Sequence, residues 1–174
     1  MHIILGLLGA VGAISVIIWR ISIAVQAART VGDAAQGLAN LPRKMRFQSN
    51  ARREGVEVIQ DPREAATLLM LSVARSAGEV TASQKATIRG QMASRFEMSE
   101  GDADEMLTQV AWLSRDLPEP GSATGRMVGV LRDAVHEGEL RQLVAMMDLV
   151  AKADGDPTDP QREIIAGYRR AAGV

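Results

Sequence analysis

The chain carries one segment twice, as VARSAGEVTASQKATIRG at residues 73–90 and as VAKADGDPTDPQREIIAG at residues 150–167. The two copies align without a gap at an offset of 77 residues. Val, Ala, Gly, Thr, Gln, Ile and Gly recur identically, and three further positions keep their charge. Such a recurrence indicates one supersecondary unit that is used twice. The most polar part of the unit is an acidic, glycine-containing turn between two helical patterns, so a chemical site is expected there first.

The residues that surround the first copy are also helical in their pattern. Residues 65–73 are largely apolar and lead to Gly78, which lacks a Cβ and therefore suits a left-handed helix end. Thr81 and Gln84 form a capping-box pattern that predicts the start of a second helix. Residues 99–102 predict the start of a third helix. The apolar residues on one stripe of the second helix are Ile88, Met92 and Phe96.

The second half of the chain repeats this organisation after a connection at residues 117–122. Asp159 as N-cap and Pro160 at the first helical position predict the start of the last helix. No segment alternates apolar and polar residues with strand-like composition. The sequence therefore predicts an all-α fold, a compact bundle of about six to seven helices with an internal two-fold repeat. Helices in this half are predicted at residues 123–136, 139–153 and 160–172.

The composition excludes several classes of function. The chain has no cysteine, which rules out disulfides, thiolate metal sites and cysteine nucleophiles. Aromatic residues make up only 3% and the formal net charge is −1, so we expect no nucleic-acid partner. The sequence pattern offers no nucleophile paired with a base, and we therefore expect a protein that is not an enzyme.

The amino-terminal segment is strongly apolar. Residues 3–19, IILGLLGAVGAISVIIW, carry no charge, and the apolar stretch continues past Arg20 to Val25. As a helix this stretch would span roughly 34 Å, enough to cross a bilayer. The alternative is a cleaved secretory signal, with Val25-Gln26-Ala27 as the cleavage site. Because no positively charged stretch precedes the apolar run, we favour a transmembrane anchor at residues 1–26.

Charge predicts the orientation of this anchor, a single pass with its N-terminus outside, in what we expect to be a bacterial-type cytoplasmic (inner) membrane. Residues 1–60 carry seven Lys/Arg against three Asp/Glu, whereas residues 61–174 carry 13 against 18. The positive-inside rule then puts the C-terminal domain in the cytoplasm. Residues 27–60 are predicted to form a basic juxtamembrane helix or linker that attracts anionic lipids. The small residues Gly6 and Ala10 share a helix face that suits a homodimer.

The turn of the second copy concentrates carboxylates. Asp154, Asp156 and Asp159 lie within six positions, and Glu163 follows one turn into the next helix. Calcium and magnesium prefer several oxygen ligands, so the pattern predicts a divalent-cation site, although its spacing is not that of an EF-hand. The alternative is an ordinary turn in which Asp159 only caps a helix. In the first copy, Glu79 is the corresponding acidic ligand candidate.

A helix that ends in Ala-Asp-Gly-acidic, followed by a short turn and a capped helix, resembles the tellurite-resistance TerB-like family. The domain at residues 61–174 is also similar to the amino-terminal region of membrane-anchored DnaJ-like co-chaperones. The resemblance implies a helical bundle, acidic residues that bind divalent metal, and a role in tellurite resistance or membrane-associated stress responses. Asp154, Gly155 and Asp156 match the second motif, and Gly78 and Glu79 match the first.

The chain departs from the family pattern at two positions and lacks one segment. Ala77 stands where the first motif has Asp, and Gln84 stands where a glutamate is usual. No His-Pro-Asp triplet is present, so a co-chaperone activity does not transfer. We expect a non-enzymatic, membrane-anchored scaffold or sensor with membrane or cytosolic protein partners. The alternative is an accessory or assembly subunit of a larger membrane complex.

Overall fold

The computed structural model describes residues 55–174, and this region is all-helical, as predicted. Residues 55–174 contain no strand. None of the helices in this region combines the length and the apolar character that a membrane span requires. The anchor predicted at residues 1–26 and most of the linker predicted at residues 27–60 lie outside the described residues. The elements are η1 (Gly55–Val58), α3 (Pro62–Ser76), α4 (Ala82–Phe96), α5 (Glu100–Leu113), α6 (Thr124–Ala134), α7 (Glu137–Ala151) and α8 (Asp159–Ala172).

Helix α3 is the centre of the bundle. Every residue from Ala65 to Ala74 is buried, because α4, α5, α6, α7 and α8 all pack against this helix. A helix that is apolar on all sides needs such a surrounding. Its two buried hydroxyls are satisfied within the helix, since Thr67 donates to the carbonyl of Arg63 at 2.7 Å and Ser72 to that of Leu68 at 2.9 Å.

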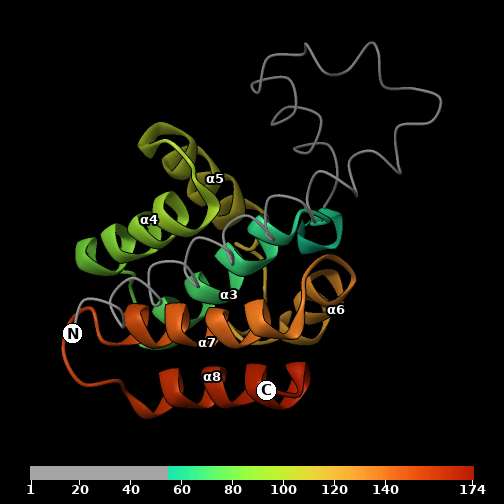
Figure 1. Ribbon diagram of the computed structural model, residues 1–174. Coiled ribbons are helices and arrows are strands. Elements are labelled where there is room, and N and C mark those ends of the chain that lie inside the picture. Colours follow the sequence, from blue (N-terminus) through green and yellow to red (C-terminus); the bar gives the residue numbers. More distant parts are fainter. Residues whose placement is uncertain (1–54) are drawn as a thin grey trace, which may run out of the picture. The chain divides into compact units, whose positions relative to one another are not determined.

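The other helices cover α3 in two groups. Helices α4 and α5 lie on one side of α3, and α7 and α8 lie on the other side, with α6 near the start of α3 (Figure 1). The core between them is aliphatic, with Met92, Met127 and Met147 fully buried. Tyr168 of α8 is also fully buried and donates a hydrogen bond from its hydroxyl to the carbonyl of Leu140 at 3.0 Å. Burial raises the pKa of the Tyr168 phenol.

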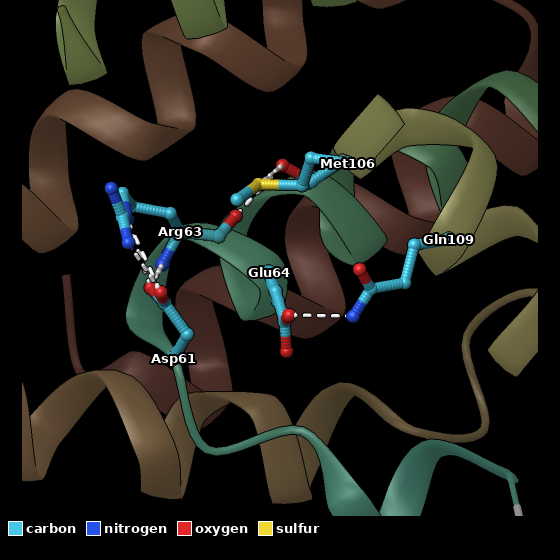
Figure 2. Close-up of polar contacts among 6 residues, drawn as sticks. Asp61, Arg63, Glu64, Met106 and Gln109 are labelled. Atoms are coloured by element: carbon cyan, nitrogen blue, oxygen red, sulfur yellow. Dashed lines mark hydrogen bonds and ion pairs between the residues drawn. The ribbon is translucent and has the colours of Figure 1, made fainter. Parts of the chain in front are cut away.

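The side chains of Asp61, Arg63 and Glu64 form hydrogen bonds that stabilise the start of α3. Asp61 is the N-cap of α3, and its carboxylate accepts from the backbone N–H of Arg63 at 2.8 Å and from its guanidinium at 2.6 Å (Figure 2). The hydrogen bond to Asp61 raises the pKa of Arg63. Glu64 accepts from the side-chain amide of Gln109 on α5 at 2.9 Å. These contacts join α3 to its own cap and to α5.

The two sequence copies form two similar helix–turn–helix units, α3–α4 and α7–α8. In the first turn the N–H of Gly78 bonds the carbonyl of Arg75 at 3.0 Å, and in the second the N–H of Gly155 bonds that of Lys152 at 3.2 Å. Both glycines have positive φ, +119° and +129°, which L side chains rarely adopt. The internal repeat is therefore present in the backbone and not only in the sequence.

The helix caps confirm one prediction and correct another. Thr81 and Gln84 form the predicted capping box at the start of α4. The predicted cap of α8 was wrong, because Thr158 is the N-cap and forms a capping box with Gln161. Asp159 instead opens the helix and pairs with Arg162 at 2.9 Å. A threonine hydroxyl caps both copies at the same place in the repeat, so the carboxylate of Asp159 is not needed for capping.

Candidate functional site

The second acidic turn lies against the first unit of the repeat. The hydroxyl of Thr81 donates to Oδ2 of Asp154 at 2.8 Å, and the hydroxyl of Ser83 donates to the carbonyl of Ala153 at 2.8 Å. Both hydroxyls stand at the start of α4, where the helix dipole is positive and favours a nearby carboxylate. The turn between α7 and α8 is thereby joined to the first residues of α4.

The remaining predicted ligands do not gather around Asp154. The side chain of Asp159 is 94% exposed and pairs with Arg162. Asp156 and Glu79 are exposed, and Glu163 lines a cleft beside α8. Across residues 55–174, no three His, Asp or Glu side chains are grouped so that they could hold a metal ion. In this conformation the carboxylates of the turn therefore do not fit a ready-made cation cage.

The half-buried side chain of Arg75 joins α3 to α5, and no sequence motif indicates this contact. Arg75 donates from Nη1 to the carbonyl and hydroxyl of Ser114, at 3.2 and 2.7 Å, and from Nη2 to the carbonyl of Ala111 at 3.1 Å. These acceptors stand at the end of α5, where helix carbonyls lack partners. Burial lowers the pKa of Arg75. Lys152, which aligns with Arg75 in the repeat, is exposed, so equal charge does not mean equal role.

A cleft of about 590 Å³ opens between α8 and the connection that precedes α6. The connection approaches α8 closely at Gly121, where a Cβ would lie 2.6 Å from Cδ1 of Ile164. Two carboxylates, Glu119 and Glu163, line the cleft, and Arg170 lines it as well. Of these three residues, the sequence pattern indicates only Glu163. The cleft depends on packing between segments that are distant in the sequence. Neither a sequence repeat nor a local motif indicates such packing.

Comparison with known proteins identifies the helical domain. The family model described as tellurite resistance protein TerB matches residues 63–170, which is more than half of the 174-residue chain. No curated protein and no solved structure matches the chain. The matched range begins in α3 and ends in α8, so it contains both units of the repeat and both turns. The chain therefore belongs to the TerB family of tellurite-resistance proteins.

Proposed function

We propose that this protein is a non-enzymatic, membrane-anchored TerB module that acts as a scaffold or sensor in a tellurite-resistance-type or other membrane-associated stress response. The family match supports the tellurite-resistance part of the proposal. The apolar residues 3–25 and the basic residues that follow support attachment to an anionic membrane surface. The chain has no cysteine, so direct thiol reduction of an oxyanion is not part of the role.

The observation that carries the sensor part is the contact between Thr81 and Asp154. It joins the exposed acidic turn of the second unit to the first turn of α4. A conformational change in the acidic turn would therefore alter the start of α4 in the first unit. Calcium or magnesium is proposed as a regulator of this turn and not as a resident cofactor. The ligands would be Asp154 and Asp156 with Asp159, Glu163 or Glu79, which must first be drawn together.

Cation titration of the full-length protein in detergent tests the regulator. We expect saturable heat on addition of Ca²⁺, Mg²⁺ or Mn²⁺ that is lost in Asp154→Ala and in Asp156→Ala. Asp116→Ala, which removes an exposed loop carboxylate paired with Arg115, is the matched control and should bind as the wild type does. A folded protein that gives no heat at millimolar cation would contradict cation control.

Crosslinking in native membranes tests the scaffold. Transient and varied partners, with self-association through the face of Gly6 and Ala10, are expected for a scaffold or sensor. A single persistent partner in fixed stoichiometry would instead identify an accessory or assembly subunit of a larger membrane complex. The two functions differ in how long a partner stays bound, so pulse-chase crosslinking separates them.

A further inference from the structure

The cleft beside α8, called here the α8 groove, has walls suited to a basic, partly apolar segment. Helix α8 lies on the outside of the bundle, on the side of α7 away from α4 and α5 (Figure 1). Apolar atoms of Ile164 and Pro120 stand beside the two carboxylates of the groove. The groove is defined by six of its lining residues, Glu119, Pro120, Gly125, Glu163, Ile164 and Ala171.

The carboxylates of the groove are available for a cationic ligand. Glu119 and Glu163 are exposed, and within residues 55–174 neither side chain forms an ion pair. Arg170 also lines the groove, which leaves one net negative charge on its walls. Residues 61–174 as a whole carry 13 Lys/Arg against 18 Asp/Glu. The local and the overall charge therefore both favour a basic occupant.

The first described residues are bonded to Arg126, the neighbour in sequence of a residue that lines this groove. Arg126 donates from Nε to the carbonyl of Val56 at 3.4 Å and from Nη2 to the carbonyl of Glu57. The residue before Arg126 is Gly125, which lines the groove. One arginine side chain thus separates the first described residues from the groove wall. The bonds of Arg126 to Val56 and Glu57, called here the tether, therefore hold the start of the described residues close to the groove.

The sequence before Gly55 supplies a segment of matching chemistry and length. Residues 43–53, RKMRFQSNARR, hold five cations together with Met45 and Phe47. Residues 43–47 in extended form would cover about 16 Å, and α8 rises by about the same length from Pro160 to Ala171. Residues 48–54 can span at most about 25 Å, which leaves ample reach from the tether.

We propose that residues 43–47 of this same chain dock in the α8 groove. In an extended segment Met45 and Phe47 share one face, which packs against Ile164, while the flanking cations pair with Glu119 and Glu163. The docked cations are then withheld from anionic lipid headgroups. This competition rests on the proposed function, because it requires the membrane attachment described above, whereas the docking itself does not.

Engineered disulfides test the docking, because the native chain has no cysteine that could interfere. The full-length protein in zwitterionic detergent would carry Met45→Cys together with Ile164→Cys. Gly125→Cys is a second partner position, where an added Cβ meets nothing within 4 Å. Disulfides form only when the two Cα atoms approach within about 7 Å. The control pairs Met45→Cys with Ser94→Cys, an exposed position on α4, which does not line the groove.

Docking predicts that the groove pair forms its intramolecular disulfide at least about tenfold faster than the control pair. A double variant with Glu119→Lys and Glu163→Lys should abolish that preference. The control is a double variant with Glu100→Lys and Asp104→Lys, which makes an equal charge change on α5 and should keep the preference. Equal rates for the groove and control pairs, or indifference to charge reversal in the groove, would overturn the docking. A fast groove disulfide that anionic lipid fails to slow would keep the docking and overturn only the competition.

Discussion

The hydroxyl of Thr81 bonds the carboxylate of Asp154 at 2.8 Å across 73 positions of sequence. The same hydroxyl accepts the N–H of Gln84 at 3.0 Å and so also caps α4. One side chain therefore starts a helix of the first unit and holds the acidic turn of the second. This double role makes Thr81 the junction between the acidic turn of the second unit and the start of α4.

Thr81→Ala should destabilise the domain more than Thr158→Ala. Both substitutions remove an N-cap from equivalent places in the repeat, at a cost of about 0.5–2 kcal/mol in the free energy of unfolding. Only Thr81→Ala also removes the bond to Asp154, which should add about 0.5–1 kcal/mol. Urea unfolding monitored by circular dichroism measures the difference. Equal losses would show that the inter-unit bond contributes nothing to stability.

Arg75→Ala should lower the free energy of unfolding by about 1–3 kcal/mol, because the carbonyls of Ala111 and Ser114 lose their charged donor and keep only longer bonds of 3.4 Å, from the Ser114 hydroxyl and the Leu117 N–H. Arg75→Lys should recover only part of this loss, since an ammonium group cannot reproduce the two-pronged geometry of a guanidinium. Lys152→Ala is the matched control and should change stability by less than about 0.5 kcal/mol. Urea unfolding compares the three variants. A control variant as unstable as Arg75→Ala would remove the distinction between the two aligned cations.

Gly155→Ala should destabilise the domain by about 1–3 kcal/mol, because the backbone at Gly155 has φ +129°. Gly90→Ala is the control and should instead stabilise by about 0.5–1 kcal/mol, since Gly90 is an exposed residue inside α4 with open space at its Cβ position. Thermal unfolding of the two variants should give shifts of opposite sign. Stabilisation by Gly155→Ala would mean that the turn relaxes to another conformation.

Tyr168 should make stability fall at alkaline pH. Its pKa is raised by burial, so the folded state holds the phenolic proton after the unfolded chain, with a pKa of about 10, has lost it. The contribution is complete below that pH and is lost as the pH rises through the higher folded-state pKa. Tyr168 is the single tyrosine of the chain, so phenolate absorbance reports on it alone. Tyr168→Phe should cost about 1 kcal/mol at neutral pH and flatten this alkaline decline.

Local signals in the sequence were sufficient to predict the helices. Gly78, the capping box of Thr81 and the apolar stripe of Ile88 and Met92 each act within a few residues, and the structure places them as predicted. The cap of α8 was misassigned because aspartate and threonine are neighbours there and both cap well. Alignment with Thr81 in the repeat would have indicated Thr158.

The candidate site depended on contacts that no local pattern encodes. The bond from Thr81 to Asp154 exists because α4 packs against α7, and Arg75 reaches Ser114 across 39 positions because α3 is surrounded by other helices. The spacing of the acidic residues showed only which carboxylates are close together in the sequence. It could not show that Asp154 turns toward α4 while Asp159 turns toward Arg162.

A double-mutant cycle on Thr81→Ala and Asp154→Ala is the most direct test of the claim that the acidic turn is coupled to α4. Urea unfolding of the wild type, both single variants and the double variant gives a coupling free energy. The hydrogen bond between the two side chains predicts about 0.5–1 kcal/mol, with the double variant less destabilised than the sum of the single variants. Additive effects would contradict the coupling, because the acidic turn and α4 would then be energetically independent.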